Sequence, residues 1–373
     1  MLDASTYVGM DVHKQSIVVA VLGARGREFV EWRLSNDGSS VQRLVRRLRK
    51  QCSGSVICCY EAGPFGYGLQ RQLEKEGVRC LVVAPSLIPR KPGDRIKTDR
   101  RDARTLAEHL RAGTLTPVHP PSEEQEAARE LCRAREDVLE ELQRQRQRIQ
   151  QMLLRRGIRC PSGKAWGARH RTWLWNQQWS WESEQAVWED LMLHLEQLES
   201  RLKSFSAKLE TLAATDPYQQ TVGWLRCFHG VDTLSAMTLL TELYSFGRFG
   251  SPRQLMAYLG LVPSEHSSGE STRRGSITKA GNRHVRRILI QAAHHYRHRP
   301  RVGAALRKRR ENQPPAVIAL TERAHERLHR RYLRLLLGRN KPAQKVVTAL
   351  ARELAGFVWA VLARPQSMAC LSN

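Results

Sequence analysis

The sequence has few cysteines, no long apolar run and no recognisable leader. Its 373 residues include eight cysteines, of which only Cys58 and Cys59 are adjacent, and no two are spaced as C-x-x-C. This pattern excludes a zinc ribbon and a disulfide framework, so we expect reduced thiols and no zinc. No apolar run approaches the roughly 18 residues of a membrane-spanning helix, and no signal peptide opens the chain. We therefore expect a cytoplasmic protein without a membrane partner.

Acidic residues are also scarce. Lys and Arg number 61 and Asp and Glu number 36, which gives a net charge of +25 and an isoelectric point near 10.5. Such a balance says little about the fold but indicates a polyanionic partner, and nucleic acid is the usual one. A membrane surface is the competing polyanion. The length is sufficient for two or three domains.

The first 120 residues alternate between short apolar runs, turns and amphipathic segments. The opening runs predict an antiparallel meander, and the later ones a βαβ-type alternation. Together they predict a three-layer α/β domain with a mixed sheet. We expect strands at 7–12, 16–22, 28–34, 56–60 and 78–84, and helices at 41–51 and 65–76.

Four acidic residues in this region stand at unusual places. Asp11 lies inside an apolar strand, where a charge is costly unless it is paired or bound to metal. Glu61 ends a strand just before a Gly-Pro turn. Asp99 and Asp102 are three residues apart on a predicted helix that runs to residue 112, so their carboxylates share one face.

Each acid has an ordinary alternative. Asp11 can bond to its own turn, Glu61 can be a solvated strand end, and Asp99 and Asp102 can serve as a helix cap and dipole partner. Four such placements together favour a site for one or two Mg²⁺ ions, or Mn²⁺, about 4 Å apart, as phosphodiester chemistry uses.

The middle of the chain is charged and helical. Residues 123–156 and 187–212 carry apolar residues at steps of three and four, which predicts a coiled coil or an antiparallel helical hairpin. Dimerisation and packing within the chain both remain open. Residues 157–188 hold six of the nine tryptophans among basic residues. These side chains can stack on unpaired bases, but we favour packing at the tip of a helical bundle.

The C-terminal part combines helices with a strongly basic stretch. Residues 225–243 resemble a helix-hairpin-helix in which Asp232 stands where the second turn glycine is expected, and further helices are expected at 254–260, 316–337 and 344–362. Residues 271–310 contain thirteen Lys and Arg and no acid, which favours contact with phosphates over a merely solvated face. The candidate nucleic-acid contacts are Arg273, Arg274, Lys279, Arg283, Arg286 and Arg287.

A small, polar and glycine-punctuated stretch, 261–275, precedes this basic segment and is predicted to be a loop. Its Ser267 and Ser268 are flanked by histidine and arginines. A serine in a loop is usually a turn former or cap. Here the arginines could stabilise a pentavalent phosphorane and so promote attack by a serine on phosphorus.

Three blocks of the first domain resemble the motifs of DEDD transposases: Tyr-Val-Gly-Met-Asp-Val-His-Lys at 7–14, Tyr-Glu-Ala-Gly-Pro-Phe-Gly at 60–66 and Lys-Thr-Asp-Arg-Arg-Asp-Ala at 97–103. Residues 260–287 resemble the C-terminal domain of the same family. The family includes the pilin-gene invertase and the RNA-guided bridge recombinases of bacterial insertion sequences. The resemblance implies a RuvC-like, ribonuclease H-type domain in which Asp11, Glu61, Asp99 and Asp102 are the metal ligands. It also places the nucleophile on Ser268, which precedes a glycine, with Ser267 as the competing neighbour.

What the resemblance implies for function is a transposase that cuts and rejoins DNA through a phosphoserine intermediate. It implies Mg²⁺ at the acidic site, a structured noncoding bridge RNA that selects the DNA, and a homodimer or dimer of dimers whose two catalytic sets come together on double-stranded DNA. It also implies a bacterial, nucleoid-associated location. The expected domains are a catalytic domain at 1–120, a helical spacer at 121–215 and a C-terminal transposase domain at 216–373.

Two other functions stay open. A RuvC-like endonuclease of the junction-resolving type would use only the four carboxylates and would form no covalent adduct. A non-catalytic nucleic-acid scaffold would use neither the carboxylates nor the serine.

Overall fold

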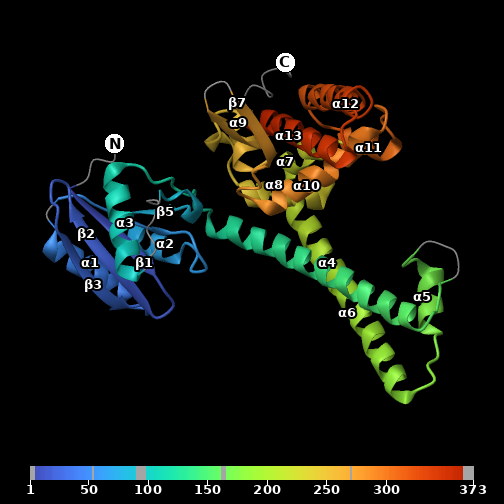
Figure 1. The fold of residues 1–373 in the computed structure, drawn as a ribbon, viewed down its shortest axis with the longest axis horizontal. Helices are drawn as coiled ribbons and strands as arrows, with labels where there is room; N and C mark the ends of the chain where they lie inside the picture. Colours follow the sequence, from blue (N-terminus) through green and yellow to red (C-terminus); the bar gives the residue numbers. More distant parts are fainter. Residues whose placement is uncertain (1–4, 53, 90–97, 161–164, 269–270, 364–373) are drawn as a thin grey trace. The chain divides into compact units, whose positions relative to one another are not determined.

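The computed structural model describes residues 5–52, 54–89, 98–160, 165–268 and 271–363 (Figure 1). The chain forms two compact units, Met1–Pro121 and Ser122–Asn373. The first unit contains the predicted α/β domain, and the second contains both the predicted helical spacer and the predicted C-terminal domain. None of the described helices combines the length and the apolarity needed to cross a bilayer.

The first unit is built on a five-stranded mixed sheet in the order β3-β2-β1-β4-β5. Strands β1, β2 and β3 form the predicted antiparallel meander, while β4 is parallel to both β1 and β5. The continuous apolar run of β2, which is buried up to Gly23, explains why it lies inside the sheet. The strands are Thr6–Val12, Ser16–Gly23, Phe29–Ser35, Val56–Glu61 and Arg79–Val83.

Helices cover both faces of this sheet, which confirms the three layers. Helices α1 (Ser40–Gln51) and α2 (Gly68–Lys75) pack over one face, where Val8, Met10 and Tyr60 are buried. Helix α3 (Asp99–Ala112) packs over the other face through leucines that meet the odd-numbered residues of β1 and β4. The helix predicted at 65–76 begins later than expected, because the Gly-Pro turn continues through Gly66, whose φ is +60°.

The second unit begins with two long helices. Helix α4 (Glu123–Arg155) starts at a capping box made by Ser122 and Gln125, and it packs along α6 (Glu182–Ala213) through an apolar core. Short helix α5 (Ala168–Trp175) lies between them in sequence. Trp188 is fully buried in this core, whereas Trp181 is 68% exposed. The predicted contact of the two apolar runs within one chain is therefore present, and a coiled coil between chains stays a prediction.

The rest of the unit is a helical body around α13 (Ala343–Leu362), whose valines and leucines are almost all buried. Residues 261–275, predicted to be a loop, instead supply most of a two-stranded antiparallel hairpin of β6 (Pro263–Ser268) and β7 (Ser271–Ile277). Apart from Pro263 with Ile277, its cross-strand pairs are polar, so no alternation of apolar residues marks it. The other helices are α7 (Gln219–Leu225), α8 (Thr233–Leu243), α9 (Pro252–Tyr258), α10 (Arg283–Ala293), α11 (Ala304–Arg310) and α12 (Pro315–Leu336).

Candidate active site

The two neighbouring parallel strands β1 and β4 bring two of the predicted ligands to one edge of the sheet. Met10 is paired with Tyr60, so Asp11 and Glu61 occupy the next corresponding positions at the carboxyl ends of the strands. Since side chains alternate along a strand, Asp11 and Glu61 lie on the α3 side of the sheet, the side on which Tyr7, Ile57 and Cys59 are buried. Asp11 is partly buried, and Glu61 is exposed.

Helix α3 lies unusually close to β1 because Gly9 has no side chain. A Cβ at Gly9 would come within 2.6 Å of the Ala107 nitrogen and closer still to the Ala103 carbonyl oxygen. Thr98 caps the start of this helix, accepting a hydrogen bond from the Arg101 nitrogen at 3.3 Å. Its first residue is Asp99, and Asp102 follows one turn later.

The side chains that meet at this edge are Asp11, Asp99 and His13. His13 Nε2 lies 3.2 Å from Asp11 Oδ2 and 3.5 Å from Asp99 Oδ1. One ligand atom from each of the three lies within 4.8 Å of the others. Glu61 and Asp102 lie outside this tight set. His13, two residues beyond Asp11, was missed by the sequence reasoning.

The electrostatics of Asp11 reflect this crowding of acids. Burial raises the pKa of Asp11, the hydrogen bond and charge of His13 oppose that effect, and the charges of Asp102 and Asp99 raise the pKa further. A bound cation would reverse the repulsion between the carboxylates. Two carboxylates and an imidazole form a donor set that suits a divalent ion, with the imidazole better matched to Mn²⁺ than to Mg²⁺. The residues present therefore fit a divalent metal.

The hairpin of β6 and β7 presents the two candidate serines differently. Ser267 donates a hydrogen bond from Oγ to Glu265 Oε1 at 2.9 Å, and Arg274 donates from Nε to Glu265 Oε2 at 3.2 Å. These bonds lower the pKa of Glu265. Ser268 is exposed at the end of β6, opposite Ser271, and has no recorded side-chain partner within the described residues. Gly269, which follows it, lies outside those residues, as does Lys97 of the third motif.

The base of this hairpin is held by backbone contacts with residues 278–282. Thr278 donates a hydrogen bond to the Val262 carbonyl at 2.9 Å, and Lys279 donates to the Gly260 carbonyl at 3.1 Å. Gly281 has a φ of +66°, and a side chain there would collide with the Tyr258 carbonyl. The segment therefore returns tightly along the chain that precedes β6.

The six basic residues predicted to contact nucleic acid fall into two groups. Arg273, Arg274, Lys279 and Arg283 are exposed, although Arg274 also pairs with Glu265. Arg286 donates hydrogen bonds to the Leu259 and Ala280 carbonyls, both at 2.9 Å, and so braces the root of the hairpin. Arg287 is 2.7 Å from Glu136 of α4. The last two make structural contacts within the second unit.

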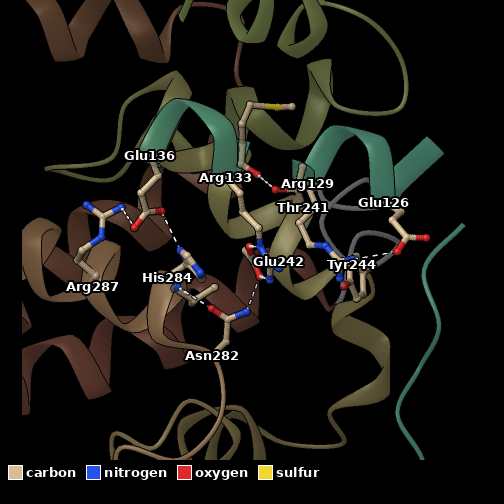
Figure 2. A network of polar contacts seen from close by, with 12 residues as sticks. Glu126, Arg129, Arg133, Glu136, Thr241, Glu242, Tyr244, Asn282, His284 and Arg287 are labelled. Atoms are coloured by element: carbon tan, nitrogen blue, oxygen red, sulfur yellow. Dashed lines mark hydrogen bonds and ion pairs between the residues drawn. The ribbon is translucent and has the colours of Figure 1, made fainter. Parts of the chain in front are cut away.

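Figure 2 shows that α4 joins α8 and α10 through a polar network. The carboxylate of Glu136 in α4 contacts both Arg287 and His284 of α10, and His284 Nδ1 lies 2.8 Å from Glu136 Oε2. Asn282, which caps α10 by accepting from the Val285 nitrogen, also donates to Glu242 Oε2 at 2.6 Å. This network fixes the start of the helix that follows the hairpin.

The predicted helix-hairpin-helix segment contains α7, a turn and α8. Asp232 caps α8, accepting from the Ser235 nitrogen at 2.7 Å. A phosphate at this turn would compete with that carboxylate for the same backbone donors. The assignment of this segment as a helix-hairpin-helix stays a prediction.

Comparison with known proteins matches both parts of the chain. A family model for a transposase of the IS110 DEDD type matches residues 8–156, and a model described as the transposase IS116/IS110/IS902 family matches residues 224–307. A putative transposase of Sinorhizobium fredii is 43% identical over 95% of this chain and 88% of its own length. A transposase for the insertion sequence element IS1533 of Leptospira borgpetersenii is 35% identical over 90% of this chain and 98% of its own length.

Proposed function

The chain belongs to the IS116/IS110/IS902 family of transposases, and from this premise we propose how it cuts and rejoins DNA. As a transposase it is an enzyme that binds DNA, cleaves it and transfers strands. Its α/β domain fits the RuvC-like fold. We propose that an exposed serine, Ser268, forms a phosphoserine with DNA while the acidic site at the end of β1 acts with a divalent metal. The observation that carries this proposal is the convergence of Asp11 and Asp99 on His13.

The acidic site is proposed to hold Mg²⁺, with Mn²⁺ as the alternative ion. Asp11 and Asp99 would be ligands through their carboxylates and His13 through Nε2, while Glu61 and Asp102 complete the set of acids around the strand end. When bound, such an ion supplies positive charge to the non-bridging and leaving oxygens of a phosphodiester. The chain's own part is to hold these acids in place at the strand end, and the close approach of α3 to β1 supports this role.

Ser268 is proposed as the nucleophile. Its Oγ forms a bond to phosphorus while the bond from phosphorus to a deoxyribose oxygen breaks, and that oxygen leaves with a proton. The number of phosphoester bonds is unchanged, so a second deoxyribose hydroxyl can displace the serine and reseal a strand without ATP. Ser267 is less suited because its hydroxyl is already bonded to Glu265. Arg273 and Arg283 are exposed and would supply charge to the phosphorane.

The remaining parts of the proposal concern partners. We propose that a structured noncoding RNA selects donor and target DNA, supported by the net charge of +25. We also propose that the active assembly is a homodimer or a dimer of dimers. We propose a division into three domains, at 1–120, 121–215 and 216–373. A junction-resolving endonuclease is not favoured, because the matched families and the relatives are transposases.

The test is a search for the covalent intermediate. Purified protein is incubated with DNA from the ends of the element and with Mg²⁺, with and without co-expressed RNA, and adducts are mapped by peptide mass spectrometry. We expect a DNA adduct on Ser268 that requires the metal, persists in Ser267→Ala and disappears in Ser268→Ala. Strand cleavage by Ser268→Ala without any adduct would support an endonuclease. An adduct on Ser267 would identify Ser267, and not Ser268, as the nucleophile.

A further inference from the structure

Helix α12 carries a row of arginines on one face. Five of them, Arg323, Arg327, Arg330, Arg331 and Arg334, follow the spacing i, i+4, i+7, i+8 and i+11, which places them on one side of a helix. They line a cavity of about 440 Å³ together with Glu326 and Glu353. The row extends over roughly 16 Å at 1.5 Å per residue.

Only part of this charge is neutralised inside the protein. Glu353 of α13 pairs with Arg327 and with Arg331, whose Nη1 lies 3.2 Å from Oε2. The other three arginines, Arg323, Arg330 and Arg334, are exposed, and no acidic partner of theirs is recorded within the described residues. Arginines one or two turns apart on a helix face repel one another. An anion from outside the chain would therefore stabilise this row.

A second cavity of about 420 Å³ continues the first. It shares Arg327, Arg331 and Glu353 with the first cavity and adds Arg253 of α9 and Arg352 of α13. Together the two cavities are lined by seven arginines and two glutamates. The second is also lined by Val262, the residue just before β6. We call the two together the arginine groove, and it leads from α12 to the root of the hairpin that carries Ser268.

We propose that the arginine groove binds the phosphate backbone of duplex DNA. Guanidinium groups in a row match the regular charges of a duplex, whose strands present a phosphate every 3.4 Å or so along the axis, so roughly five lie beside α12. A small anion would need only one or two of these side chains. The part of the groove on α12 and α13 lies outside the two matched family segments. DNA seated there would be held next to the root of the hairpin.

This proposal rests on the action of the family on DNA and not on the assignment of Ser268. The groove can therefore fail while the covalent intermediate is confirmed, and the groove can bind DNA even when another hydroxyl attacks. The measurement below distinguishes duplex DNA from RNA, the main competing occupant of the groove.

The experiment compares two triple variants of the full-length protein. In the groove variant, Arg323, Arg330 and Arg334 are changed to Gln, which leaves the Glu353 pairs intact. In the control variant, Arg144, Arg148 and Arg155 are changed to Gln, because these are also exposed and lie along one long helix, α4. Both variants lose the same charge. Binding of a short blunt duplex is measured by fluorescence anisotropy over a range of salt concentrations, and circular dichroism checks folding.

We expect the slope of log affinity against log salt to become less steep by about 2.7 in the groove variant, since each lost phosphate contact contributes about 0.9. Between about 50 and 200 mM salt, this difference in slope corresponds to a roughly 40-fold smaller loss of affinity than in the wild type. The control variant should keep the wild-type slope. Equal slopes in the two variants would overturn the proposal. So would a groove variant that binds duplex DNA normally but loses affinity for a structured RNA.

Discussion

Arg133 of α4 and Glu242 of α8 are joined by two parallel hydrogen bonds, from Nε to Oε1 at 2.7 Å and from Nη2 to Oε2 at 2.9 Å (Figure 2). Only 2% of the Glu242 side chain is exposed. The same carboxylate receives Asn282, the cap of α10. The buried carboxylate of Glu242 thus connects α4 to the start of α10, the helix that follows the hairpin of β6 and β7.

We predict that Arg133→Gln destabilises the second unit by about 3 kcal/mol, because it leaves the buried carboxylate of Glu242 without its cationic partner. Denaturant unfolding of the full-length protein measures the change. The matched control is Arg144→Gln, whose partner Glu140 is 3.9 Å away and exposed, so a change within about 0.5 kcal/mol is expected. If the two variants lost the same stability, the buried pair would not be holding α4 in place.

The ion pair of Arg133 and Glu242 should also make the stability of the second unit depend on pH. Burial raises the pKa of Glu242, but the hydrogen bonds from Arg133 and Asn282 and the charge of Arg133 outweigh it, so the folded-state pKa lies below the ordinary value for a glutamate. A lowered carboxyl pKa contributes stability above that value, and the contribution is lost as pH falls through the folded-state pKa. The stability difference between wild type and Arg133→Gln should therefore be largest near neutral pH and narrow below about pH 4.5. A difference independent of pH would contradict this.

The five strands of the first unit and most helices could be predicted because their signals are local. The apolar run of β2 indicates a strand, and the capping threonine of α3 indicates the start of a helix. Neither signal depends on the rest of the chain. The hairpin of β6 and β7 could not be predicted, since its cross-strand pairs are polar apart from Pro263 with Ile277 and its glycines suggest a turn. Here pairing between two segments, not the composition of either, determines the structure.

In the candidate site too, some residues could be predicted from local sequence and others could not. Asp11 stood out because a charge inside an apolar strand is costly. His13 did not, although it lies two residues on and so returns to the same face at the point where β1 ends. In the basic segment, the charge run could not reveal that Arg287 faces Glu136 of α4, a contact made only in the folded second unit.

Divalent metal should stabilise the first unit, and the ligand set predicts how. With free ion at a hundredfold excess over its Kd, the free energy of unfolding should rise by about 2.7 kcal/mol, read as an increase in Tm. Asp11→Asn should abolish the increase for Mg²⁺ and Mn²⁺ alike. His13→Ala should weaken the response to Mn²⁺ more than to Mg²⁺, because imidazole is a poorer ligand for Mg²⁺.

The control for the metal response is Glu28→Gln, an exposed acid outside the cluster, which should respond as the wild type does. Chelation should return each responsive protein to its starting Tm. If the Tm of His13→Ala rose as much as that of the wild type with both ions, His13 would not be a ligand, and the acids would be the only candidate ligands.

The close approach of α3 to β1 gives the last prediction. Gly9→Ala places a Cβ against the Ala103 carbonyl and the Ala107 nitrogen, and neither backbone atom can rotate away. Helix α3 must retreat, and Asp99 moves with it. We expect a loss of about 2 kcal/mol in stability and a weakened Tm response to divalent metal. Gly38→Ala is the matched control, since a Cβ there meets nothing within 4 Å. A Gly9→Ala protein with wild-type stability and a full metal response would show that the placement of the acids does not depend on this contact.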